Sequence, residues 1–246
     1  MSVDAYGVLA KYYDLLMEDV PYRRWVSFIA SFAEKMPTSH VKIVDAGCGT
    51  GTVALGLCQK GLSVVGLDRS SEMLALARNK ADELNFTLPL LHCDLADLNL
   101  NADMVISTCD GLNHLLTSKE VITFFRKTHT CLSAGGYLIF DINSPEKYRR
   151  ILANNVFAWN TKKIDVVWVN RYAAPINHAD IAIYSPVEKS CWSKTIFSIT
   201  QRCHQLSTLI YYLQHTGFRL VGLWDNYSRK SITAMAQRIT FVAQKI

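Results

Sequence analysis

Three glycines at alternate positions, Gly47, Gly49 and Gly51, separate an apolar run at 41–44 from a helix-like run. A turn at this place needs positive φ angles, and glycine also lets the backbone come close to a ligand. The helix that follows begins with N–H groups that have no partner inside it. We therefore predict that the stretch IVDAGCGTGTVALGL, residues 43–57, forms a backbone cradle for a nucleotide-like cofactor. A plain tight turn is the alternative.

Three aspartates lie beside this stretch or at the ends of later apolar runs. Asp68 ends the run in VVGLDRS, where its carboxylate can accept both ribose hydroxyls of an adenosine group. Asp94, in LLHCDLADL, could meet the adenine edge. Asp45 precedes the glycines and could orient the cradle or reach an ammonium group of the ligand. Aspartate is also common at strand ends and helix caps, but the four features in this order indicate a cofactor site.

The elements that must position these residues alternate between short apolar strands and amphipathic helices. Ser70 or Ser71 can cap one helix, and Thr117 with Glu120 forms a capping box for another. This alternation predicts a parallel sheet with helices on both faces. The expected strands are 41–44, 62–67, 89–93, 104–107, 137–142, 218–224 and 238–244, and the expected helices are 22–36, 50–60, the segment after residue 71, 117–132 and 206–215.

Beyond residue 143 the pattern changes. The segments 164–172, 178–184 and 194–200 are extended runs separated by polar turns, which predicts an antiparallel patch. The expected fold class is therefore α/β, with a doubly wound, mostly parallel, seven-stranded sheet and a small antiparallel β insertion.

Composition limits the function classes. Half of the residues are hydrophobic and 19% are charged, as in ordinary globular proteins. No apolar run approaches the roughly 20 residues that span a bilayer, and the N-terminus lacks the order of a secretory signal. The net charge of +5 is mild and scattered, so it does not indicate nucleic-acid binding. The seven cysteines include no C-x-x-C pair, and we expect reduced thiols, no metal site and a cytoplasmic protein.

The full motif D-x-G-C-G-T-G resembles the first motif of class I S-adenosylmethionine-dependent methyltransferases. VVGLDRSSEMLALAR is similar to the second motif of that family, and HCDL is similar to the third. The resemblance covers residues 40–143 and 205–246 and implies S-adenosyl-L-methionine as cofactor, with S-adenosyl-L-homocysteine as product. The cofactor-binding residues that it implies in this part of the chain are Asp45, Gly47, Cys48, Gly49, Gly51, Asp68, Arg69, Met73, Cys93, Asp94, Leu95 and Cys109.

The N-terminal segment AYGVLAKYYDLLMEDVPYRRW resembles a bacterial subgroup of small-molecule methyltransferases that includes amino-sugar N,N-dimethyltransferases. In that subgroup aromatic residues fold over the cofactor, and the resemblance carries this role to Tyr6, Tyr13 and Tyr22. Aromatic faces stabilise a sulfonium cation, and phenolic hydroxyls can bind a carboxylate. Packing of the N-terminal helix is the alternative role.

The resemblance also implies how the chain is organised. Residues 1–246 are expected to form a single methyltransferase domain with an N-terminal helical lid at 1–36, a cofactor-binding core at 37–145 and 205–246, and a substrate-side insertion at 146–204. One departure concerns the segment FSITQRCHQL, which keeps the Gln201–Arg202 pair of the subgroup but has Ile199 where a histidine is expected. His204 is expected to be a surface or capping residue.

Methyl transfer from a sulfonium is an in-line displacement, and positioning of the acceptor supplies most of the catalysis. A general base is needed only if the acceptor starts protonated. The candidates after the fourth strand are Asp110, Asn113 and His114, and we expect His114 to face the acceptor as a base or ligand. The alternative is that His114 caps the loop.

The loop after the fourth strand reads CDGLN and lacks the prolines of the [DNS]-P-P-[FY] loop that methylates nucleic-acid bases. This favours a small-molecule acceptor with a nitrogen or oxygen nucleophile. Methylation of a tRNA or protein and a non-catalytic cofactor-binding module remain alternatives. A nicotinamide-dependent oxidoreductase is disfavoured by the glycine spacing and by the lack of a Tyr-x-x-x-Lys motif. We expect a monomer or homodimer without membrane attachment.

Overall fold

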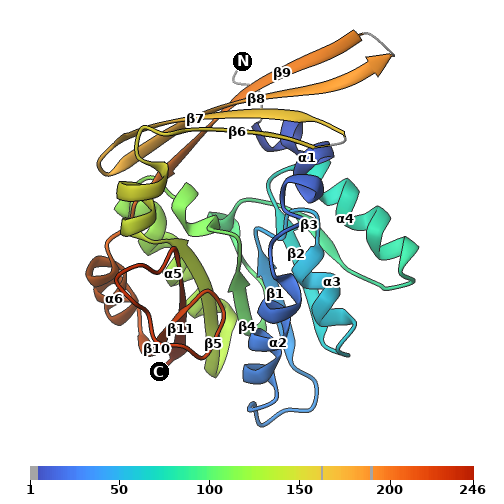
Figure 1. The fold of residues 1–246 in the computed structure, drawn as a ribbon. Helices are drawn as coiled ribbons and strands as arrows, with labels where there is room; N and C mark the ends of the chain where they lie inside the picture. Colours follow the sequence, from blue (N-terminus) through green and yellow to red (C-terminus); the bar gives the residue numbers. More distant parts are fainter. Residues whose placement is uncertain (1–4, 162, 189–190) are drawn as a thin grey trace.

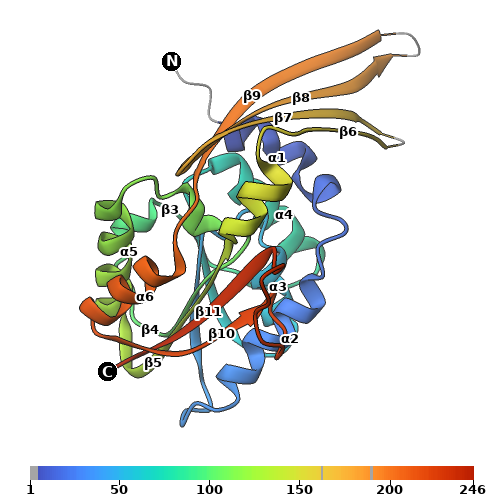
Figure 2. The same ribbon diagram turned by 60° about the vertical axis from the view of Figure 1, so that its left-hand side comes forward.

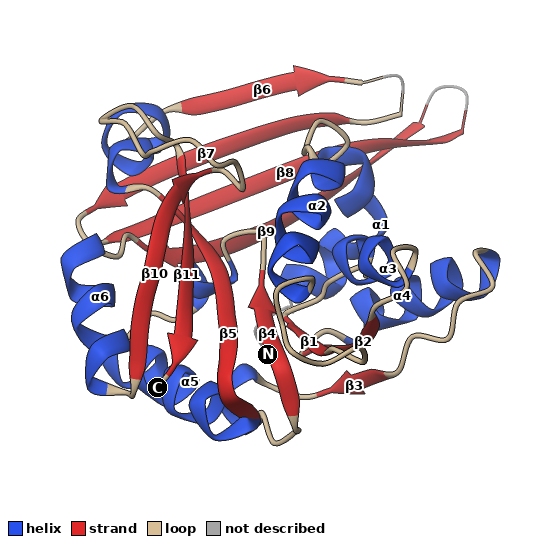
Figure 3. Cartoon of the chain, turned by 90° about the horizontal axis from the view of Figure 1, so that it is seen from below, coloured by secondary structure: helices blue, strands red, loops and turns tan. Residues whose placement is uncertain are grey.

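The strands form two sheets, one stacked over an edge of the other (Figure 1). The computed structural model describes residues 5–161, 163–188 and 191–246. The larger sheet has seven strands in the order β10-β11-β5-β4-β1-β2-β3, which Figure 3 shows from below. Its strands are β1 (Lys42–Ala46), β2 (Ser63–Asp68), β3 (Leu90–His92), β4 (Ala102–Ser107), β5 (Leu132–Asn143), β10 (Phe218–Asp225) and β11 (Arg238–Lys245).

The seven-stranded sheet is parallel except at β11, which runs antiparallel to both β5 and β10. Helices cover both of its faces, α2 and α3 on one and α5 and α6 on the other (Figure 2). The helices are α1 (Ala5–Leu16), α2 (Tyr22–Ala33), α3 (Thr52–Cys58), α4 (Ser71–Glu83), α5 (Ser118–Cys131) and α6 (Leu206–His215), with short turns η1 (Leu95–Asp97), η2 (Gly111–His114) and η3 (Lys147–Leu152).

Side chains along each strand point alternately to the two faces of the larger sheet, and the apolar ones fill a core on each face. In β1, Ile43 packs with the α2 and α3 side, whereas its neighbour Val44 packs with the α5 and α6 side. On α2, Trp25 and Ile29 lie one turn apart and are almost fully buried. Because every central strand contributes apolar side chains to both faces, the carboxyl ends of the strands are held at fixed positions along one edge of the sheet.

The smaller sheet is an antiparallel insertion with the order β6-β7-β8-β9. Its strands are β6 (Val156–Asn160), β7 (Asp165–Ala173), β8 (Ile176–Glu188) and β9 (Cys191–Arg202). Its inner face packs on α1, where Ile181 and Phe197 meet Leu9 and Ala10 in a third apolar cluster. The N-terminal helix is therefore sandwiched between the insertion and the larger sheet (Figure 1).

The predicted fold class is confirmed, including the seven strands and the antiparallel insertion. Both capping predictions are also confirmed, since Ser70 accepts from the Met73 N–H and Thr117 with Glu120 forms a capping box. Four elements were missed, namely the short turns η1 and η2, strand β6 and the π-helical turn η3. Strand β6 is an exposed edge strand without clear alternation, and η3 is a π-helical turn, for which periodicity gives no signal. Strand β5 begins earlier than predicted, because Leu132 already pairs with Ala102.

Candidate active site

The three glycines after β1 all have positive φ angles, at +81° for Gly47, +55° for Gly49 and +76° for Gly51. An added Cβ would meet no atom within 4 Å at Gly47 or Gly49, whereas at Gly51 it would lie 3.0 Å from the Ala77 Cβ. The first two glycines therefore leave open space above the backbone, and the third allows close packing of the loop on α4. The prediction of positive φ angles is confirmed.

The carboxylate of Asp68 is fixed against this glycine loop. Its Oδ2 accepts a hydrogen bond from the Gly49 N–H at 2.8 Å, and its Oδ1 accepts one from the Ser70 N–H at 2.9 Å. The N–H groups of Gly47 and Cys48 both donate to the carbonyl of Leu67, at 2.8 and 2.9 Å. Each carboxylate oxygen has a second lone pair, so Asp68 can accept further hydrogen bonds from a ligand while it holds the loop.

Asp45, in β1, is a buried carboxylate with no hydrogen-bond partner on either oxygen among the described residues. Burial, and secondarily the negative charge of Asp68, raise its pKa from 3.8 to about 7. An unsatisfied buried carboxylate is costly, and a cationic ligand group nearby would relieve the cost. The open space above the glycine backbone, the remaining lone pairs of Asp68 and the unpartnered carboxylate of Asp45 fit an adenosyl amino-acid cofactor, which has hydroxyl and ammonium donors.

A pocket of about 250 Å³ lies between α1 and the carboxyl ends of the central strands. It brings together twelve of the predicted site residues, namely Tyr6, Tyr13, Gly47, Gly49, Asp68, Arg69, Met73, Cys93, Asp94, Leu95, Cys109 and His114. The predicted residues that do not form its wall are Tyr22, Asp45, Cys48, Gly51, Asp110 and Asn113. The wall residues that sequence reasoning missed are Ala96, Thr108, Gly111, Leu115, Glu120 and Phe124.

The N-terminal tyrosines reach the pocket region from α1 and the start of α2. The Tyr6 hydroxyl lies 2.7 Å from His114 Nε2, and the Tyr22 hydroxyl lies 3.6 Å from the sulfur of Cys109. Burial raises the pKa of Tyr6, Tyr13 and Tyr22, and it raises the pKa of Cys109 to about 12. These groups therefore stay protonated and uncharged at neutral pH, while the Arg69 guanidinium in the same wall lies 5.9 Å from the centre of the Tyr6 ring.

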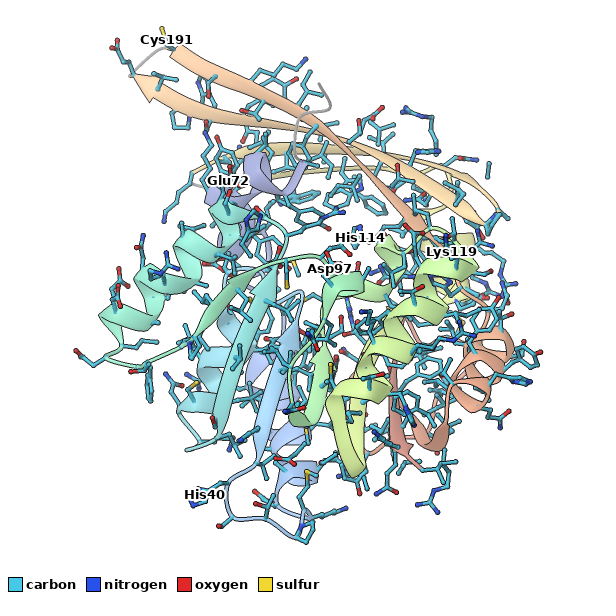
Figure 4. The ribbon with its side chains drawn as sticks, turned by 180° about the vertical axis from the view of Figure 1, so that it is seen from behind. His40, Glu72, Asp97, His114, Lys119 and Cys191 are labelled. Atoms are coloured by element: carbon cyan, nitrogen blue, oxygen red, sulfur yellow. The ribbon has the colours of Figure 1, made fainter. Side chains whose placement is uncertain are left out.

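His114 ends the short helix η2 and lies on the side of the core that faces the four-stranded sheet (Figure 4). Two consecutive non-glycine residues before η2, Cys109 and Asp110, have φ angles of +58° and +53°. This uncommon backbone redirects the chain after β4 and lets η2 carry His114 to the pocket. Burial lowers the pKa of His114 and Arg69 lowers it further, against the opposing charge of Asp110, so the ring is neutral at neutral pH.

Asp110 belongs to a buried charge network. Its Oδ1 accepts from Arg238 Nη2 at 2.8 Å, and Arg238 also pairs with Asp141, which in turn accepts from the Tyr227 hydroxyl at 2.6 Å. Burial acts to raise the pKa of Asp110, but the charges of Arg238 and Lys147 outweigh it and the pKa is lowered. Asp110 therefore stays ionised and paired.

Asn113 links the core to the insertion. Its Nδ2 donates to the Arg202 carbonyl at 2.8 Å, and its Oδ1 accepts from the Asn143 N–H at 2.9 Å. His204 is also buried rather than at the surface as expected, with its ring nitrogen 3.1 Å from the Leu112 carbonyl. The expected surface position was wrong because the segment after β9 packs onto η2.

The described part of the chain has three further properties that bear on the site. It holds no group of three or more His, Cys, Asp or Glu side chains that could bind a metal ion. It contains no helix with the length and hydrophobicity needed to cross a bilayer. The cysteines, all in described segments, are free thiols.

Comparison with known proteins agrees with this geometry. Residues 43–136 match the family profile of a methyltransferase domain. A candidate methyltransferase from Geobacillus is 28% identical over 98% of this chain and 99% of its own length. A structure of an S-adenosylmethionine-dependent methyltransferase from Clostridium acetobutylicum has a TM-score of 0.88 at 26% identity and covers 96% of both chains. A sugar N-methyltransferase from Streptoalloteichus, 16% identical, has a TM-score of 0.78 over 100% of this chain and 96% of its own.

The protein has the class I methyltransferase fold, and the glycine loop with its neighbouring carboxylates and these similarities indicate an S-adenosylmethionine-dependent methyltransferase. Its cofactor is accordingly S-adenosyl-L-methionine.

Proposed function

We propose that the protein transfers a methyl group from S-adenosylmethionine to a nitrogen or oxygen nucleophile of a small molecule. The observation that carries the proposal is the arrangement of Asp68 and the open backbone of Gly47 and Gly49 around one end of a pocket, with the unpartnered carboxylate of Asp45 buried in β1, two residues before Gly47. The other end of the same pocket has the neutral wall of Tyr6 and His114. A charged methyl donor and an uncharged nucleophile can thus lie next to each other in one pocket.

Each end of the pocket has a distinct role in this proposal. Asp68 accepts the ribose hydroxyls, Asp94 meets the adenine edge and Met73 packs beside the adenine, while Asp45 compensates the ammonium group. When bound, the cofactor supplies an activated methyl group on a sulfonium. The rings of Tyr6, Tyr13 and Tyr22 stabilise that positive charge through their faces, and the remaining predicted residues form the surrounding backbone and wall.

His114 is the proposed base or acceptor ligand. Its neutral ring can take a proton at Nε2, the nitrogen beside the Tyr6 hydroxyl. Asp110 and Asn113 are proposed to support it, since Asp110 is ion-paired with Arg238 and Asn113 ties η2 to the insertion. A proton acceptor at this place is used when the nucleophile arrives as an ammonium or a hydroxyl.

The small-molecule assignment follows from the enclosure of the pocket. We propose that residues 1–36 act as a lid and that the insertion at 146–204 supplies the acceptor side of the single domain. Tyr6 already bridges from α1 to η2, and Tyr12 bonds Ser185 of the insertion at 2.9 Å. The similar fold of a sugar N-methyltransferase supports the finer assignment to the amino-sugar-like subgroup. The free thiols support a cytoplasmic enzyme, and the mild net charge of +5 supports an enzyme without a nucleic-acid partner.

The test is formation of S-adenosylhomocysteine from S-adenosylmethionine in the presence of separate acceptor classes: small amines, amino sugars, small hydroxyl compounds, bulk tRNA and unfolded protein. Transfer to a small amine or hydroxyl compound is the expected result. Transfer only to tRNA or protein overturns the small-molecule assignment. Tight cofactor binding with no transfer in any class indicates a non-catalytic binding module, and thermal stabilisation by NADH alone would indicate an oxidoreductase.

A further inference from the structure

Gln201, near the end of β9, joins the insertion to the proposed base. Its Nε2 lies 2.7 Å from Asp110 Oδ2 and 3.3 Å from His114 Nε2. Its Oε1 accepts a hydrogen bond from the Tyr148 hydroxyl at 3.0 Å. Gln201 is not part of the pocket wall, so any effect on the reaction passes through a neighbour.

The orientation of the Gln201 amide is dictated by its partners. The Asp110 carboxylate is ionised because Arg238 is paired with it, and an ionised carboxylate can only accept hydrogen bonds. A flipped amide would place its oxygen against this carboxylate, so the NH₂ group must face Asp110. The second hydrogen of that NH₂ group is then available to His114.

This orientation selects one tautomer of His114. A ring nitrogen that faces the NH₂ group of Gln201 is stabilised when it carries a lone pair, and it also lies within hydrogen-bond distance of the Tyr6 hydroxyl. The proton of the neutral ring then resides on Nδ1. The ring also has a hydrogen bond with the Thr200 backbone, which acts to raise the pKa of His114.

The two donors to Nε2 come from different parts of the molecule. Tyr6 belongs to α1, the proposed lid, whereas Gln201 belongs to the insertion and is anchored by Asp110 and Tyr148. When the lid opens, Tyr6 is withdrawn and Gln201 stays. The other charged group that acts on the ring, Arg69, disfavours a second ring proton but does not choose between the two nitrogens.

We propose that Gln201 is a positioning residue that holds His114 as the Nδ1–H tautomer, with the Nε2 lone pair directed to the Tyr6 hydroxyl and the pocket. The inference rests on the proposed role of His114, which it deepens. Gln201 thereby presents a proton-accepting nitrogen to the acceptor even before the lid has closed.

The test is the ¹⁵N spectrum of the histidine rings in the full chain, with His114 assigned by comparison with His114→Gln. The wild type should show a neutral ring protonated on Nδ1. Tyr6→Phe should keep this tautomer, as should Tyr6→Phe combined with Gln214→Leu, an exposed control. Tyr6→Phe combined with Gln201→Leu should raise the Nε2–H form to a comparable share.

An Nε2–H ring in the wild type would overturn the inference, and this measurement needs only the assignment variant His114→Gln to fold. Equal tautomer shares in the Gln201 and Gln214 double variants would also overturn it. Loss of methyl transfer with every acceptor class, while the ring remains Nδ1–H and depends on Gln201, would refute the proposed function and leave the positioning intact.

Discussion

The Gly49 N–H donates a 2.8 Å hydrogen bond to the carboxylate of Asp68, which joins the loop after β1 to the end of β2. Neighbouring parallel strands bring these two residues together, because the last residue of β1, Ala46, pairs with Leu67, which directly precedes Asp68. The contact therefore couples the shape of the glycine loop to the position of the carboxylate. Substitution of Gly49 tests the geometry of the loop, and substitution of Asp68 tests the charge of the carboxylate.

Gly49→Val should abolish binding of S-adenosylhomocysteine, because a side chain would fill the open space above the backbone. The left-handed φ angle should also cost roughly 1–2 kcal/mol of stability. Gly61→Val is a matched control, since Gly61 has a φ angle of +79° and open space at its Cβ but lies outside the pocket wall. Calorimetric titration and thermal unfolding of both variants provide the comparison. A Gly49 variant that folds and binds normally would refute the cradle.

Asp45 should make the stability of the ligand-free protein depend on pH. Its folded-state pKa of about 7 exceeds the ordinary 3.8, so the folded state binds this proton more tightly. The contribution of Asp45 to the free energy of unfolding should be largest below about pH 4 and should fall as the pH rises to about 7, by up to about 4 kcal/mol.

Asp45→Asn should remove this contribution, so the difference between the wild-type and variant curves isolates it from other carboxyl groups. Saturating S-adenosylhomocysteine should reduce the fall, because the ligand ammonium compensates the ionised form. Denaturant unfolding from pH 4 to 8 measures both effects. Parallel curves for the two proteins would show that the carboxylate is satisfied in some other way.

Tyr13→Leu should weaken binding of S-adenosylmethionine more than binding of S-adenosylhomocysteine, because only the former carries the sulfonium charge. A cation–π contribution of about 0.5–2 kcal/mol corresponds to a roughly two- to thirty-fold difference in the ratio of the two dissociation constants. Tyr211→Leu, at an exposed position on α6, serves as the control. Equal weakening for both ligands would assign Tyr13 to packing.

His114→Ala should lower turnover by about a hundredfold with the best acceptor of the panel, in the range of general-base effects. The dissociation constant of S-adenosylhomocysteine should change less than threefold, because the ring lies on the acceptor side. His215→Ala, at the exposed end of α6, controls for loss of a histidine. Wild-type turnover in the His114 variant would exclude it from the chemistry.

Local sequence features were enough to predict where the glycine loop and its neighbouring carboxylate lie in the fold. Gly47, Gly49 and Asp68 lie at strand ends, where residue type and position along the strand are enough to place them. The charge network was not predictable, because Arg238 and Asp110 are 128 residues apart and become neighbours only when β11 joins the sheet beside β5. The contact between Gln201 and His114 depends in the same way on how the insertion folds back.

The missed wall residues illustrate a second limit. Phe124 and Leu115 belong to an apolar pattern that also builds the core, so periodicity gives no sign that they reach a pocket. Glu120 was assigned only to the capping box, which it does form. Its presence in the wall depends on the approach of α5 to η1.

Titration of S-adenosylhomocysteine into the wild type and into Asp68→Ala tests the central claim most directly, with Asp82→Ala on the exposed face of α4 as a control. The wild type and the control should bind one ligand per chain. Asp68→Ala should bind about a hundredfold more weakly, because two charge-assisted hydrogen bonds of at least about 1.5 kcal/mol each are lost. Unchanged affinity in Asp68→Ala, or no binding to the wild type at millimolar concentration, would contradict the account.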